Sequence, residues 1–154
     1  MALRTICVEG DEVLRKKSKP VTDFNQKLWD LLEDMAETMY HANGVGLAAV
    51  QVGILRRVVV IDVGEGLIEL VNPEIVSQKG EQTDLEGCLS FPGQYGRVTR
   101  PEKVKVKAQD RNGKSITLRG EGLLARAFCH ELDHLDGRVF KDLATEMVDV
   151  KEEE

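Results

Sequence analysis

Hydrophobic residues recur at helical spacing in two stretches of the chain. The first runs from about residue 25 to residue 42, where apolar side chains lie three or four positions apart and acidic side chains fill the other side. This period is typical of an amphipathic helix. Asn43-Gly44 can end that helix, and the second stretch begins near Glu121 and stops near Gly137. We therefore expect an N-terminal helix and a C-terminal helix.

Between these helices the pattern changes to that of short strands. Arg57 to Val63 contains an unbroken aliphatic run, and Leu67 to Asn72 follows after a Gly-Glu-Gly turn. Residues 103–108 alternate lysine with valine or alanine, which is the period of a half-buried strand. Asn112-Gly113 is a hairpin signal that leads into a strand at 115–119. The sequence thus predicts an α+β fold, with short antiparallel strands packed around the C-terminal helix.

Length and composition limit the class of protein. The chain has 154 residues, of which 42% are hydrophobic and 31% charged, as in an ordinary globular domain. We expect a single domain over residues 1–154, with a short acidic tail at about 142–154. The net charge of −6 disfavours a dedicated nucleic-acid binder, so we expect no DNA partner.

The sequence also indicates a compartment. Glu9 follows the N-terminus too closely to leave room for the apolar stretch of a signal peptide. The longest aliphatic run has four residues, whereas a membrane span needs about 20, so we expect no membrane partner. Three cysteines are an odd number, which favours reduced thiols over disulfides. We therefore expect a cytoplasmic protein.

The most informative motif is the H-E-x-x-H pattern from His130 to His134 on the predicted C-terminal helix. Residues i and i+4 of a helix are neighbours, so the two imidazoles can converge on one ion. Glu131 can then reach a water bound to that ion. A catalytic divalent site usually has three protein ligands and one open position, so a third ligand must come from elsewhere.

The identity of that third ligand is open on local grounds. A third histidine six residues after the second would fit one pattern, but that position is Phe140, and a glutamate about twenty residues on would fall in the terminal Glu152–Glu154. Cys88 lies in a constrained Gly- and Pro-punctuated segment and could supply a thiolate. Cys129 is adjacent to His130 on the helix, so it should point about 100° away.

Three segments taken together resemble the peptide deformylase family. Gly44–Gln51 matches its G-x-G-L-A-A-x-Q motif, Glu86–Ser90 matches E-G-C-L-S, and His130–His134 matches H-E-x-x-H, in the same order. The resemblance implies a deformylase-like catalytic domain that removes the N-formyl group from the N-terminal formylmethionine of newly made proteins. It further implies that water or hydroxide bound to a metal attacks the formyl carbon.

The resemblance also assigns roles to single residues. It implies three ligands of one divalent metal: Cys88, His130 and His134. The implied metal is Fe(II) in cells, while Zn, Ni or Co can occupy the site in purified protein. Glu131 is the implied proton shuttle, and Gln51 and the backbone N–H of Leu89 are implied to hold the formyl oxygen.

A peptide channel and an apolar pocket for the methionine side chain are implied as well. The residues implied to form them are Val45, Gly46, Glu86, Gly87, Leu123, Arg126 and Ala127. The implied partners are N-formylmethionyl peptides and nascent chains, with the ribosome as a candidate transient partner. The acidic charge argues against strong general affinity for RNA.

Two other interpretations of the histidine pair remain open. One is a small metallo-amidase or peptidase that shares the helix but not the substrate. The other is a metal-stabilised binding module with a closed four-ligand site, in which Asp133 or Asp136 supplies the fourth ligand.

Overall fold

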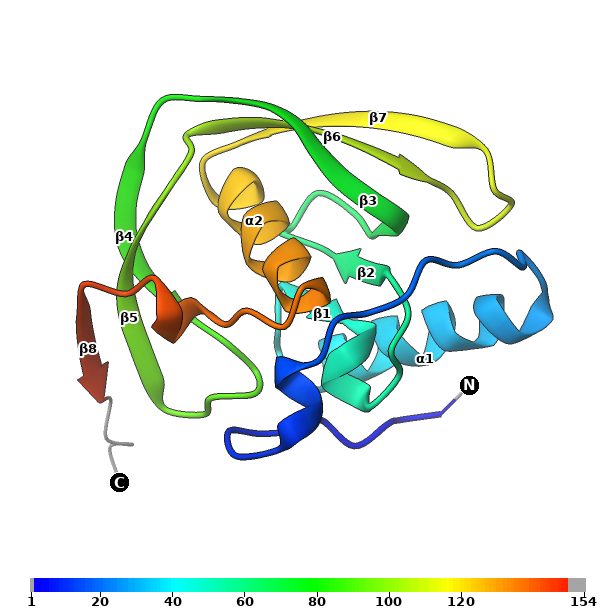
Figure 1. The fold of residues 1–154 in the computed structure, drawn as a ribbon, viewed down its shortest axis with the longest axis horizontal. Helices are drawn as coiled ribbons and strands as arrows, with labels where there is room; N and C mark the ends of the chain where they lie inside the picture. The colour runs from blue at the N-terminus through cyan, green and yellow to red at the C-terminus, as the bar shows by residue number, and fades with distance from the viewer. Residues whose placement is uncertain (1, 150–154) are drawn as a thin grey trace.

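The computed structural model describes residues 2–149, and two α-helices lie within this range (Figure 1). Helix α1 spans Gln26–His41 and helix α2 spans Leu123–Leu135. Both lie where the hydrophobic periodicity predicts a helix. Three short 3-10 helices complete the helical elements of the described chain: η1 Glu12–Arg15, η2 Ala49–Val52 and η3 Phe140–Asp142.

The strands form two antiparallel sheets. The first sheet has the order β1-β2-β3-β6-β7, and the second has the order β4-β5-β8. Their bounds are β1 Gly46–Ala48, β2 Val58–Ile61, β3 Ile68–Lys79, β4 Gln82–Gly87, β5 Gln94–Arg100, β6 Lys103–Gln109, β7 Ser115–Glu121 and β8 Glu146–Asp149. The predicted α+β class is confirmed.

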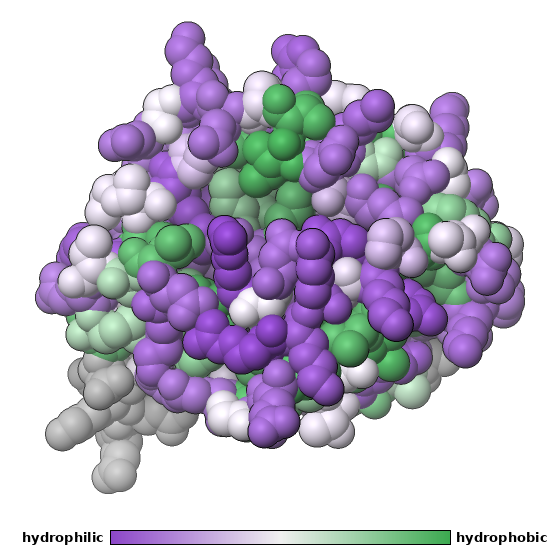
Figure 2. All heavy atoms as spheres, in the orientation of Figure 1, coloured by the Kyte–Doolittle hydropathy of each residue, from purple (hydrophilic) through white to green (hydrophobic). Residues whose placement is uncertain are grey.

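Helix α2 lies between the two sheets, in the middle of the molecule (Figure 1). Phe128 and Leu135 are fully buried and pack with the apolar faces of β2, β3 and β6. Helix α1 begins at Asn25, whose side chain accepts a hydrogen bond from the Leu28 N–H, an arrangement that stabilises helix N-termini. Its apolar face covers β1 and β2 in a second core cluster. Hydrophilic side chains predominate on the face shown in Figure 2, where hydrophobic ones form separate patches.

Strand β3 extends beyond the predicted end at Asn72 and continues to Lys79. The Asn-Pro pair after Val71 is a turn signal in the sequence, but here a register shift against β6 absorbs it. Asn72 adopts a positive φ of 52°, and its side chain accepts from the Val21 N–H and donates to the Val21 carbonyl. These bonds replace the local turn with a bulge inside a longer strand.

The C-terminal part of the described chain also differs from the expected acidic tail. Residues 146–149 form β8, which pairs with β5. Gly96 of β5 allows this pairing, because a Cβ there would lie 2.9 Å from the sulfur of Met147. Residues 150–154 of the expected tail lie outside the described residues.

None of the helices between residues 2 and 149 combines the length and the apolar character that crossing a membrane would require.

The turn after α2 generates a prediction about stability. Gly137 has a φ of 75°, and a Cβ there would lie 2.5 Å from the backbone oxygen of Arg15. We expect Gly137→Ala to lower the free energy of unfolding by about 2–5 kcal/mol. The strain of a left-handed backbone conformation at alanine adds to the overlap of the new Cβ with the Arg15 backbone. Gly53→Ala is the matched control, because φ is 82° but no atom lies within 4 Å, so it should cost only about 1–2 kcal/mol. Urea unfolding measures both, and equal losses would contradict the packing argument.

Candidate metal centre

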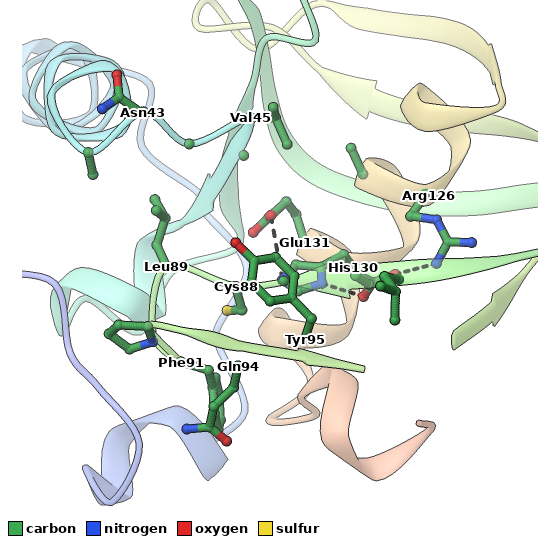
Figure 3. A pocket seen from close by; sticks show the side chains of 18 of the residues that line it. Asn43, Val45, Cys88, Leu89, Phe91, Gln94, Tyr95, Arg126, His130 and Glu131 are labelled. Carbon is green, nitrogen blue, oxygen red and sulfur yellow. Dashed lines mark hydrogen bonds and ion pairs between the residues drawn. The ribbon is translucent and has the colours of Figure 1, made fainter. Parts of the chain in front are cut away.

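Cys88, His130 and His134 form a compact cluster between the end of β4 and helix α2. Their ligand atoms all lie within 4.8 Å of one another. The Sγ atom of Cys88 is 3.3 Å from Nε2 of His134, which is itself 3.3 Å from Nε2 of His130. Figure 3 shows Cys88 and His130 among the side chains that line a cavity. The structure therefore brings together the three residues predicted as ligands.

The geometry of this cluster fits a single divalent ion. Two nitrogen ligands at about 2.0–2.1 Å from a tetrahedral ion lie about 3.3 Å apart, which is the spacing of the two histidine nitrogens. A thiolate with two imidazoles is a donor set that suits zinc and neighbouring transition metals. Within residues 2–149 no other group of this kind is found.

The two aspartates considered as a fourth ligand have other partners. Asp133 accepts a hydrogen bond from Nη1 of Arg100 at 2.7 Å, and Asp136 accepts one from Nη1 of Arg57 at 3.0 Å. The closed four-ligand interpretation therefore gains no support from the geometry.

Glu86 fixes the orientation of His130. Its carboxylate contacts Nδ1 of His130 and accepts hydrogen bonds from Arg100 and Arg126. Burial by itself raises the pKa of Glu86, but the hydrogen bonds from His130 and Arg100 outweigh it and hold the pKa well below its usual range. An anionic Glu86 fixes the His130 ring through its contact with Nδ1.

Burial by itself lowers the pKa of His130, but the charge of Glu131 and the hydrogen bonds with Cys88 and Glu86 outweigh it and raise the pKa well above its ordinary value. A metal ion at the cluster would therefore displace a proton from Nε2 of His130 on binding. For His134, burial prevails: it lowers the pKa well below its ordinary value, which keeps that imidazole neutral.

Glu131 is buried beside the cluster. Its Oε2 atom lies 3.9 Å from Nε2 of His130, and its Oε1 atom has no hydrogen-bond partner in the protein. Burial, the largest effect, raises the pKa of Glu131 to about 7. Gly46 makes this position possible, because a Cβ there would lie 2.5 Å from Oε2. The carboxyl group is thus close to the cluster and able to gain or lose a proton near neutral pH.

Gln51 is buried next to Cys88. Its Oε1 atom accepts from the Ala48 N–H at 2.9 Å, and its Nε2 donates to Oγ of Ser90 at 3.1 Å. The same Nε2 lies 3.6 Å from Sγ of Cys88. The amide nitrogen is therefore oriented toward the cluster. Leu89 directly follows Cys88 and lines the same cavity, and the role of its backbone N–H remains a prediction.

A cavity of about 420 Å³ opens in front of the cluster (Figure 3). All seven residues predicted for substrate binding line it: Val45, Gly46, Glu86, Gly87, Leu123, Arg126 and Ala127. The side chains of Glu86 and Arg126 are buried and bonded to each other, so they form part of its wall. Their role in substrate binding remains a prediction.

Tyr95 also lines the cavity, although it belongs to none of the sequence motifs. Its ring lies over Gly87, where a Cβ would be 2.7 Å from a ring carbon. Gly87 and Tyr95 are partners across the β4–β5 pair. Only the pairing register reveals this contact, and the local sequence pattern does not encode the register.

A cysteine sulfur and two imidazoles, beside a buried carboxyl group and an open cavity, are the arrangement of a metal-dependent hydrolase. Comparison with known proteins gives the family. The family model of polypeptide deformylases matches residues 3–149, and this chain belongs to that family.

Known peptide deformylases are similar to this chain in sequence and in structure. A peptide deformylase of Thermoanaerobacter pseudethanolicus is 61% identical, over 100% of this chain and 97% of the relative. The crystal structure of a peptide deformylase from Legionella pneumophila matches with a TM-score of 0.90 and 51% identity, over 93% of this chain and 86% of that one. The crystal structure of a peptide deformylase from Thermotoga maritima matches with a TM-score of 0.91 and 46% identity, over 94% of this chain and 99% of that one.

The cluster generates a prediction about metal binding. His134→Ala removes one of the three donors, so we expect affinity for Zn²⁺ to fall by more than about 100-fold, beyond the range typical of substitutions outside the ligands. Cys129→Ser is the control. This neighbouring residue is buried on the same helix, but its sulfur is not among the ligand atoms that converge in the cluster. Competition with a chromophoric chelator measures both. Equal affinity of His134→Ala and the wild type would contradict the assignment.

Proposed function

We propose that this chain removes the formyl group from the N-terminal formylmethionine of newly made proteins by metal-dependent hydrolysis. The observation that carries the proposal is the cluster of Cys88, His130 and His134 with Glu131 beside it, at the base of an open cavity. Membership of the deformylase family supports the choice of substrate.

In this proposal Cys88, His130 and His134 hold one divalent ion, which is Fe(II) in cells, while Zn, Ni or Co can replace it in purified protein. When bound, such an ion would supply Lewis acidity toward water and toward the formyl oxygen. The thiolate reduces the net charge of the site, so the other groups that stabilise the developing oxyanion become more important.

Glu131 moves the proton in this proposal. Its unpartnered Oε1 accepts a proton from the attacking water and then delivers one to the leaving amine. Burial raises the pKa of Glu131 to about 7 before any ion is bound, and its position 3.9 Å from Nε2 of His130 puts the carboxyl group beside the cluster, where the attacking water would lie.

Gln51 and Leu89 stabilise the formyl oxygen as it gains charge. The amide nitrogen of Gln51 is already oriented by its bonds to Ala48 and Ser90, so little reorganisation is needed during the reaction. One such donor is typically worth about 2.7–4 kcal/mol in the transition state.

The cavity wall binds the methionine residue. Val45, Leu123 and Ala127 supply apolar surface for a thioether side chain, and Gly46 and Gly87 leave room for the peptide backbone. We further propose that residues 1–154 form one catalytic domain that acts in the cytoplasm on nascent chains, with the ribosome as a transient partner.

The role of Glu131 can be tested with one substitution. Glu131→Gln removes the proton acceptor but preserves size, so formate release from a formyl-Met peptide should fall by about 10²–10⁴-fold. Bound metal should remain at one equivalent. Glu37→Gln on the exposed side of α1 is the control and should keep the wild-type rate.

Two results would contradict the proposal. One is wild-type turnover by Glu131→Gln. The other is cleavage of internal bonds in an unformylated peptide with no formate released from the formylated one, which would favour a peptidase.

A further inference from the structure

A buried network of charged side chains connects the two segments that carry the proposed metal ligands. Glu86 lies on β4, two residues before Cys88, and its Oε2 atom contacts Nδ1 of His130 on α2. One carboxylate thus joins the strand that leads to the sulfur with the helix that carries the imidazoles. Any group that fixes this carboxylate also influences how the ligands converge.

Arg100, the last residue of β5, fixes it from the neighbouring strand. Its Nε and Nη2 atoms donate to Oε1 and Oε2 of Glu86 at 3.1 and 2.7 Å. Its Nη1 atom donates to Asp133 at 2.7 Å. Asp133 lies about one turn after His130 on α2, so Arg100 contacts both ligand-bearing segments at once.

The second arginine in the network has a different contact. Arg126 donates to Oε1 of Glu86 and to the backbone oxygen of Val98. Oε2, the oxygen that contacts His130, receives its arginine hydrogen bond from Arg100. Arg100 is therefore placed to control the direction in which Glu86 presents that oxygen.

Stability alone is a poor explanation for this arrangement. The side chains of Arg100 and Glu86 are each 4% exposed. A buried ion pair of this kind is often no more stabilising than apolar residues of similar size, because both charges lose their hydration. A role in geometry accounts for the bidentate contact, since the planar fork of arginine fixes a carboxylate in one orientation.

We propose that Arg100 is a positioning residue of the metal centre, which acts through Glu86 on His130 and through Asp133 on α2. It sets the ring orientation of His130 and the separation of Cys88 from the two histidines. This inference rests on the metal site of the proposed function and is independent of the substrate.

Arg100→Lys tests the inference, because it keeps the charge and removes the fork. We expect Co²⁺ to bind at least about tenfold more weakly, as is typical when a partner of a ligand is disturbed. Competition with a chromophoric chelator measures the dissociation constant. Arg111→Lys is the matched control: Arg111 holds Glu69 with the same two nitrogens at 3.0 and 2.7 Å, outside the cavity, and its loss should leave Co²⁺ affinity unchanged.

A double-mutant cycle tests whether Arg100 acts through Glu86. Glu86→Gln should weaken Co²⁺ binding, and adding Arg100→Lys to it should cause little further loss, because the two side chains work as one unit. Fully additive losses would overturn the proposed route through Glu86.

The outcomes separate this inference from the proposed function. A folded Arg100→Lys protein that binds Co²⁺ like the wild type overturns the role of Arg100 and leaves the proposed function intact. A wild-type protein that binds no Co²⁺ defeats the proposed function itself. If Arg100→Lys does not fold, Asp133→Asn is the second test. The Asp133 side chain is 24% exposed, so its replacement should disturb the fold less than replacement of the buried Arg100. Several-fold weaker Co²⁺ binding supports the inference, and unchanged binding overturns it.

Discussion

The whole arrangement depends on the burial of helix α2. Ten of its thirteen residues are buried, and these include His130, Glu131 and His134. Polar groups removed from water require partners inside the protein, or they destabilise the fold. The second sheet supplies these partners: Glu86 from β4 and Arg100 from β5 neutralise and orient the polar side of the helix. Folding and assembly of the site are therefore the same event.

Burial also determines the chemistry of the site. Removal from water raises the pKa of Glu131 to about 7, and it keeps His134 neutral and available as a donor. The Glu131 carboxylate can occupy its buried position because Gly46 has no side chain there. Glu131 and Glu86 are both buried carboxyl groups near His130, yet their pKa values move in opposite directions. Glu86 accepts hydrogen bonds from Arg100, Arg126 and His130, whereas Oε1 of Glu131 has no protein partner.

The sequence predicted the parts of the fold that local patterns encode. The two helices follow from apolar periodicity, and the three candidate ligands follow from short motifs and their family resemblance. Strand β8 and the extension of β3 past Asn72 were not predicted, because acidic residues and an Asn-Pro pair are unfavourable in strands unless a partner strand compensates. The links from Glu86 to Arg100 and from Gly87 to Tyr95 depend on the register of β4 against β5. No periodicity within one segment contains that information.

X-ray absorption spectroscopy of the zinc-loaded protein tests the central claim most directly, since it reports which atoms surround the ion. The account predicts one sulfur at about 2.3 Å and two imidazole nitrogens at about 2.0–2.1 Å, with the remaining position filled by a light atom from solvent. A coordination shell without sulfur, or with one imidazole, would contradict the convergence of Cys88, His130 and His134 on a single ion.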